Sequence, residues 1–175
     1  RSSAASDVYK RQVVGVHIEP FGAYSSKYKT IKEVPDGATV AIPNDPVNTG
    51  RALVMLSNAG LITLKNPRDP QSATKDITAN PHRFKIRELE GAMLARAVNQ
   101  VDLAFIFANY ALEAGIDTDK ALLVEKGSDL YVEYLVARPD NINDPGIQKL
   151  AKALNSDRVR SFILTRYKGK ILPGF

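Results

Sequence analysis

The sequence contains no cysteine and only two histidines, His17 and His82. The absence of cysteine excludes disulfides and thiolate metal sites, and it suits a periplasmic protein. The two histidines lie far apart and lack the spacing of metal ligands, so we expect no metal and no cofactor. No apolar run approaches the ~20 residues that a membrane-spanning helix needs. An apolar signal segment is also missing near the start of the chain.

The sequence lacks a basic stripe with interleaved aromatic residues, which a nucleic-acid-binding face would show. The chain carries a net charge of +5, with 25% charged and 44% apolar residues, which are ordinary values for a globular domain. Part of the excess comes from residues 1–12, RSSAASDVYKRQ. We expect this segment to be a non-native leader, and we expect no nucleic-acid partner.

From Val13 onward the hydrophobic pattern predicts alternating strands and helices. The apolar stretch 101–108, VDLAFIFA, is typical of a central strand that is covered on both faces. This alternation favours an α/β fold with a largely parallel sheet. The predicted strands are 13–18, 38–43, 84–89, 101–108, 121–125 and 130–138, and the predicted helices are 45–60, 73–79, 91–99, 109–115, 144–154 and 156–169.

The stretch AIPNDPVNTGRAL, residues 41–53, carries the most chemical information. A buried strand leads directly into a helix, with Asp45 as a good N-cap and Pro46 at the first helical position. Backbone N–H groups and the positive end of the helix dipole favour an anion there. Asn48 and Arg51 share one helix face, and the guanidinium can bind a carboxylate through two hydrogen bonds. The alternative is that Arg51 is an ordinary surface residue.

The same stretch resembles the hallmark segment of the methionine-binding lipoprotein (NlpA) family, which comprises substrate-binding subunits of ABC importers. Further similar segments occur in the order that the family shows. They are VHIEPFGAYS (16–25), IRELEGAMLAR (86–96), FANYALEAG (107–115) and YKGKILPGF (167–175).

The resemblance implies a type II periplasmic-binding-protein-like α/β fold, in which two lobes close around a ligand. It further implies capture of methionine or a similar apolar amino acid, delivery to an ABC importer permease, and a lipid anchor at a periplasmic or cell-surface membrane when the protein is full length. The family begins earlier than this chain. We therefore expect one complete lobe with a mixed, largely parallel sheet in residues 23–108, and an incomplete lobe from residues 13–22 and 109–175.

By the resemblance, Arg51 matches the arginine that pairs with the ligand carboxylate. Phe107 and Glu133 each stand where the family commonly has an asparagine that hydrogen-bonds the amino acid. Glu133 shares a predicted strand face with Tyr131 and Leu135, so it is expected to need a partner. Our hypothesis is that Glu133 binds the ligand ammonium while Arg51 binds the carboxylate. The alternative is that Glu133 lies at a strand edge near water.

Three further candidates come from the matched segments. His17 and Tyr24 lie where the chain is expected to cross between lobes and are candidates for lining the cleft, with a structural role for His17 and packing for Tyr24 as the alternatives. Asn109 is a candidate for ligand contact or for capping the following helix.

The sequence shows no nucleophile with a base, no glycine-rich phosphate loop and no cluster of carboxylates, so we expect no enzymatic activity. A ligand-sensing or enzymatic domain on the same fold is one alternative. The second alternative is a lipoprotein that has lost ligand binding. The departures from the family pattern at Phe107 and Glu133 support this alternative.

Overall fold

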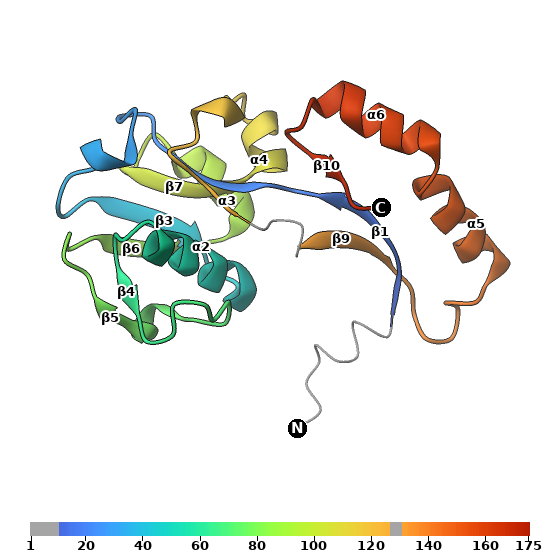
Figure 1. The fold of residues 1–175 in the computed structure, drawn as a ribbon, viewed down its shortest axis with the longest axis horizontal. Helices are drawn as coiled ribbons and strands as arrows, with labels where there is room; N and C mark the ends of the chain where they lie inside the picture. Colours follow the sequence, from blue (N-terminus) through green and yellow to red (C-terminus); the bar gives the residue numbers. More distant parts are fainter. Residues whose placement is uncertain (1–10, 127–130) are drawn as a thin grey trace. The chain divides into compact units, whose positions relative to one another are not determined.

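The computed structural model describes residues 11–126 and 131–175. The chain divides into two compact units, which are Arg1–Pro20 with Gly127–Phe175 (unit 1) and Phe21–Lys126 (unit 2) (Figure 1). The boundary expected after residue 108 lies inside unit 2, because the strand that follows it pairs with the first strand of that unit. Most of the predicted leader, residues 1–12, lies outside the described residues.

Unit 2 is built on a five-stranded sheet with the order β6-β3-β7-β2-β8. Strand β3 runs parallel to both of its neighbours, β6 and β7, whereas β2 is antiparallel to β7 and β8. The predicted mixed sheet is therefore confirmed, and its parallel part consists of β6, β3 and β7. Parallel neighbours need a crossover, and α2 and α3 supply it. The strands are β2 (Phe21–Tyr24), β3 (Thr39–Pro43), β6 (Lys85–Leu89), β7 (Leu103–Phe107) and β8 (Leu123–Val124), and the helices are α2 (Pro46–Asn58), α3 (Gly91–Ala97) and α4 (Ala108–Glu113).

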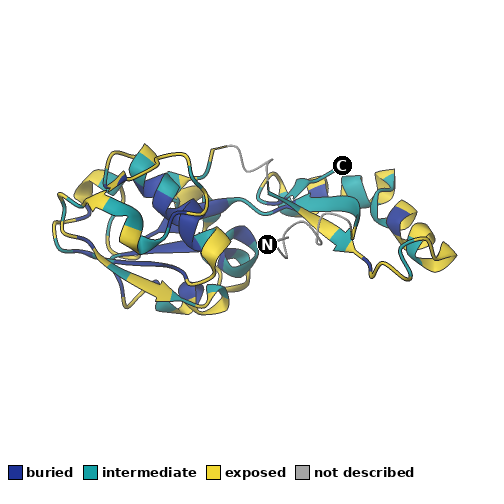
Figure 2. Cartoon of the chain, turned by 90° about the horizontal axis from the view of Figure 1, so that it is seen from below, coloured by how far each residue is buried: buried dark blue, intermediate teal, exposed yellow. Residues whose placement is uncertain are grey.

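Both faces of this sheet are covered by apolar side chains. Along β7, Leu103 and Phe105 join the cluster beneath α2, whereas Ala104 and Ile106 join the cluster that contains residues of α3 and α4. This alternation follows from the two-residue period of a strand. The interpretation of residues 101–108 as a strand covered on both faces is confirmed. Figure 2 shows that the buried residues of unit 2 gather along its sheet.

The start of α2 agrees with the prediction. Asp45 is the N-cap, its side chain accepts a hydrogen bond from the backbone N–H of Asn48 at 3.0 Å, and Pro46 begins the helix. Gly60 follows the helix with φ of 74°, a left-handed conformation that glycine adopts without strain. Ala59, the C-cap residue of the helix, is exposed.

The helix predicted over residues 73–79 is wrong. The chain forms a single 3-10 turn, η2 (Thr74–Asp76), and then a strand, β5 (Ile77–Ala79). The carboxylate of Asp76 accepts from the backbone N–H of Ala73 at 2.9 Å, which closes that turn. The residues after the turn pair with β4 (Thr63–Leu64), so the backbone finds its partners in a neighbouring segment instead of in its own next turn. Two other 3-10 turns in the described residues are η1 (Ile31–Glu33) and η3 (Thr118–Lys120).

Unit 1 contains an antiparallel three-stranded sheet with the order β10-β1-β9 and two helices. Asp144 and Ser156, the first residues of the two helices predicted here, are the N-caps of the helices. The predicted strand 130–138 appears as β9, and its expected first residue, Leu130, lies outside the described residues. The elements are β1 (Gln12–Ile18), β9 (Val132–Val136), α5 (Pro145–Leu154), α6 (Asp157–Tyr167) and β10 (Leu172–Pro173). Over the described residues no helix combines the length and the apolar character that crossing a membrane requires.

Asp102 links the start of β7 to two other segments of unit 2. Its carboxylate accepts from Lys27 Nζ and from the backbone N–H of Thr39, both at 2.8 Å. The hydrogen bond from Lys27, then that from Thr39, lowers the pKa of Asp102 below its ordinary value, and the charge of Lys85 acts in the same direction. A depressed pKa means that the ionised carboxylate stabilises the folded protein.

We therefore expect the contribution of Asp102 to be complete above the pKa of an unfolded aspartate, about 3.9, and to be lost as the pH falls through the lower folded-state pKa. Urea unfolding of the natural protein and of Asp102→Asn, measured from neutral to acidic pH, tests this. The two unfolding free energies should differ at neutral pH and converge in acid. A difference that stays constant with pH would show that the charge of Asp102 contributes nothing.

Candidate ligand-binding site

Arg51 lies on the second turn of α2, directly after the strand that leads into the helix. It is only 6% exposed, although guanidinium groups are rarely buried without partners. The preceding turn is held by Thr49, whose hydroxyl donates to the backbone carbonyl of Pro43 at 2.7 Å. The alternative of an ordinary surface arginine is therefore excluded in this structure.

The guanidinium of Arg51 is bound side-on by the carboxylate of Glu125. Arg51 Nε donates to Oε1 at 2.9 Å and Nη2 donates to Oε2 at 2.6 Å. Nη1 donates to the side-chain oxygen of Asn48 at 3.0 Å. The side chain of Glu125 is only 7% exposed, so both charges of this pair are largely removed from water. A two-bond pair of this kind is the strongest arrangement between a guanidinium and a carboxylate.

Two aromatic rings complete the surroundings of Arg51. Phe21 and Phe107 stack with their centroids 4.3 Å apart and their planes 17° from parallel. The guanidinium carbon lies 5.2 Å from the first ring centroid and 5.3 Å from the second. Both distances fall within the ~6 Å range of a cation–π contact. Phe107 therefore supports the cation with its ring.

A guanidinium can bind a carboxylate through two hydrogen bonds, and in this structure Arg51 binds that of Glu125 in this way. Sequence reasoning did not single out Glu125, which closed the predicted strand 121–125. The signal was an acidic residue directly after the apolar run ALLV, because a carboxylate in such surroundings needs a partner. Asn48, Arg51 and Phe107, three of the predicted site residues, are brought together around it.

Two other predicted site residues of unit 2 have local roles in this structure. The side-chain oxygen of Asn109 accepts from the backbone N–H of Tyr110 at 2.8 Å inside α4, whereas the N-cap of this helix is Phe107, so Asn109 is not its capping residue. Tyr24 is 5% exposed and belongs to the apolar cluster with Leu94 and Ile106, which supports packing. Burial, and then the charges of Asp119 and Asp117, raises the pKa of Tyr24 to about 12.

The remaining two predicted site residues lie in unit 1. His17 and Glu133 are register partners in the β1–β9 pair. His17 Nε2 hydrogen-bonds the carboxylate of Glu19 at 3.0 Å. This bond, and the charges of Glu19 and Glu133, raise the pKa of His17. Glu133 itself is exposed, which agrees with the alternative of a strand-edge carboxylate near water.

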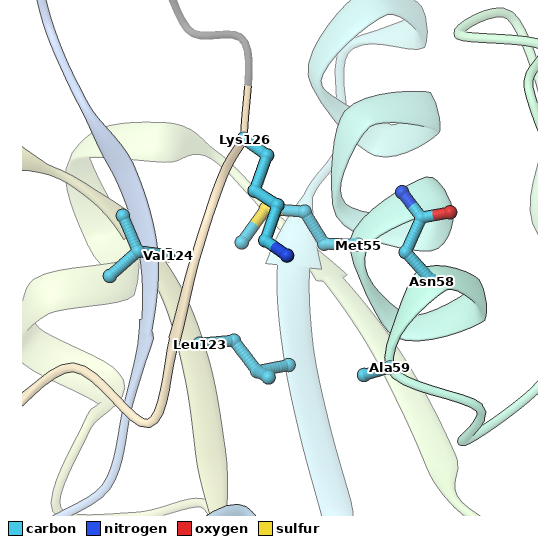
Figure 3. Close-up of a pocket in the computed structure, with 6 residues that line it drawn as sticks. All are labelled: Met55, Asn58, Ala59, Leu123, Val124 and Lys126. Atoms are coloured by element: carbon cyan, nitrogen blue, oxygen red, sulfur yellow. The ribbon is translucent and has the colours of Figure 1, made fainter.

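A groove of about 340 Å³ lies between α2 and the segment that contains β8 (Figure 3). Met55 and Leu123 give it apolar walls, whereas Asn58 and Lys126 bring polar groups to it. Its volume is at the lower end of the range, about 300–1,000 Å³, that is typical of small-molecule sites. Met55 stands one helical turn after Arg51, so both residues share a face of α2. The full lining is Met55, Asn58, Ala59, Leu123, Val124 and Lys126. The described residues contain no group of three or more His, Cys, Asp or Glu side chains that could hold a metal ion.

Comparison with known proteins places these features in a family context. Residues 4–175 match the family model described as NlpA lipoprotein. The chain is 39% identical over 169 residues to the "Probable D-methionine-binding lipoprotein MetQ" of Pasteurella multocida, which covers 95% of this chain and 61% of that protein. It is also 39% identical to Lipoprotein 28 of Escherichia coli, with 95% of this chain and 63% of that protein covered.

Solved structures agree with these relatives. A nutrient-binding protein from Burkholderia cenocepacia, solved bound to methionine, aligns with a TM-score of 0.89 and 36% identity over 98% of this chain and 75% of that chain. The chain thus has the mixed α/β fold of periplasmic substrate-binding proteins. It spans about three fifths of the length of the curated relatives described above. The family match begins at residue 4, so it overlaps the predicted leader, residues 1–12.

Proposed function

The chain belongs to the NlpA lipoprotein family, and from this membership we propose that it is part of an extracytoplasmic solute-binding protein for methionine or a similar apolar amino acid. The full-length protein delivers this ligand to the permease of an ABC importer. It is held at the membrane by a lipid anchor, on the periplasmic or cell-surface side.

The observation that carries this proposal is the buried guanidinium of Arg51. It lies on the first turns of a capped helix, it receives a carboxylate side-on, and aromatic rings surround it. A free amino acid presents the same carboxylate chemistry, and an apolar side chain suits aromatic and methionine surfaces. The similarity to a methionine-bound protein supports this choice of ligand.

We further propose that the protein is not an enzyme. The relatives and structural neighbours compared with the chain include proteins named for binding D-methionine and other nutrients. The Arg51 environment within the described residues combines one cation, one carboxylate, an amide and two phenyl rings, which is chemistry for holding a zwitterion.

Calorimetric titration of the natural full-length protein tests the proposal. The protein is first unfolded and refolded to remove any ligand carried through purification. L-methionine, D-methionine, leucine and a charged amino acid such as lysine are then titrated in turn. We expect saturable binding of a methionine enantiomer and no binding of lysine. Failure of every apolar amino acid to bind would favour a family member that has lost its ligand.

The predicted contact between Glu133 and the ligand ammonium stays a prediction, because Glu133 and Arg51 belong to different units. If it is correct, Glu133→Gln should weaken methionine binding about tenfold or more, since a hydrogen bond to a charged group contributes about 1.5–3 kcal/mol. The exposed Glu113 on α4 offers a matched control, because Glu113→Gln makes the same change in net charge. Equal affinities of the natural protein and Glu133→Gln would exclude the contact.

A further inference from the structure

The side-on edge of the Arg51 guanidinium, formed by Nε and Nη2, is occupied by a carboxylate of the chain itself. This edge offers the best geometry for an incoming carboxylate, because both N–H bonds point in parallel toward two oxygens. A ligand carboxylate and Glu125 therefore compete for the same two donors.

We propose that Glu125 is an internal stand-in for the ligand carboxylate and leaves this edge of Arg51 when an amino acid binds. The inference deepens the proposed function and rests on it, because it assumes that Arg51 receives the carboxylate of the ligand. It assigns to Glu125 a role in setting ligand affinity.

The exchange preserves the charge balance around Arg51. The buried guanidinium is neutralised by one carboxylate before binding and by another afterwards, so it is never left without a counter-ion. Removing a carboxylate partner of a buried cation is strongly unfavourable, which makes direct replacement the accessible route. The two phenyl rings and Asn48 hold the guanidinium in place while the carboxylates exchange.

Only the side chain of Glu125 has to move. Its backbone N–H donates to the carbonyl of Phe21 at 2.9 Å, which anchors the chain at the end of β8. β8 is an edge strand of the sheet. The residues on either side of Glu125, Val124 and Lys126, are exposed, and Val124 is 58% exposed. Rotation about the three torsions of the glutamate side chain can therefore carry the carboxylate toward water without breaking the sheet.

A rescue experiment tests whether another carboxylate can take this place. Glu125→Ala in the natural full-length protein removes the resident carboxylate and leaves space beside Arg51. Sodium acetate should then raise the thermal midpoint of Glu125→Ala by more than sodium chloride does at equal ionic strength. This difference between the two salts should be larger for Glu125→Ala than for the natural protein or Glu113→Ala, because acetate also stabilises folded proteins without binding a specific site. Equal responses of Glu125→Ala to the two salts would overturn the inference.

A second variant covers the case in which Glu125→Ala does not fold. Glu125→Gln has almost the same shape and no charge, so it should bind methionine about tenfold more tightly than the natural protein, a typical size of coupling between two ligands. Unchanged or weaker binding by Glu125→Gln would refute the competition while leaving the proposed function intact. Rescue by acetate without methionine binding to any variant would refute the proposed ligand and support the exchangeable carboxylate.

Discussion

Replacing Glu125 by leucine should lower the free energy of unfolding by about 3–5 kcal/mol, the cost of leaving one partner of a buried ion pair alone. Arg51 is only 6% exposed and its guanidinium lies against two phenyl rings that stack on each other, so its charge is largely shielded from water. Urea unfolding of the natural full-length protein and of the variant, at neutral pH, measures the loss.

Removing the positive charge of Arg51 in place of the negative charge of Glu125 serves as a control. Arg51→Met should cost less than Glu125→Leu, because the glutamate stands at the end of an edge strand and can turn its carboxylate toward solvent. The double variant Arg51→Met with Glu125→Leu replaces both charges by apolar groups and should recover most of the stability, since buried pairs are often exchangeable for apolar residues. Additive losses in the double variant would show that the two side chains do not act as a pair.

Substituting alanine for Gly50 should destabilise the protein by about 1–3 kcal/mol, the range seen when a packed interior is overfilled. A Cβ at this position would stand 1.8 Å from the carbonyl oxygen of Pro70 and 2.5 Å from its carbonyl carbon. These are backbone atoms of the connection that follows β4, so the helix or that connection has to move. The displacement would also reach Arg51, the next residue of α2, and ligand affinity should fall together with stability.

Helix propensity alone would make Gly50→Ala stabilising, so the sign of the measured stability change tells the two effects apart. Alanine in a helix is favoured over glycine by about 0.5–1 kcal/mol. At Gly91, at the start of α3, the nearest atom to an added Cβ is a ring carbon of Tyr110 at 3.8 Å, an ordinary contact. Gly91→Ala should therefore be neutral or slightly stabilising under the same conditions. A stabilising effect of Gly50→Ala would contradict the close packing of α2 against Pro70.

The elements that sequence reasoning placed correctly are those whose causes are local. Asp45 followed by proline starts α2, because a short acidic side chain accepts a backbone N–H and proline needs none. Glycines with positive φ follow the ends of α2 and α4, at Gly60 and Gly115. The apolar run 101–108 becomes a strand covered on both faces. In each case the relevant information lies within a few residues.

The incorrect prediction of a helix at residues 73–79 shows that local patterns do not predict pairing with a distant segment. Its composition fits a helix, but Ile77–Ala79 pairs with a strand that begins at Thr63. Pairing across a sheet outweighs a weak local preference, because it satisfies the backbone groups and buries side chains at the same time. The edge position of β8 in unit 2 could not be predicted either, because the order of strands also depends on pairing between segments far apart in the sequence.

The sequence by itself determined the family, the mixed α/β character of the chain and Arg51 as the central cation of the candidate site. Only the tertiary structure decided which carboxylate that cation meets. Arg51 and Glu125 are 74 positions apart, and no spacing rule connects them. Their pairing follows from α2 packing beside the edge strand β8, where burial of a guanidinium makes a nearby carboxylate necessary.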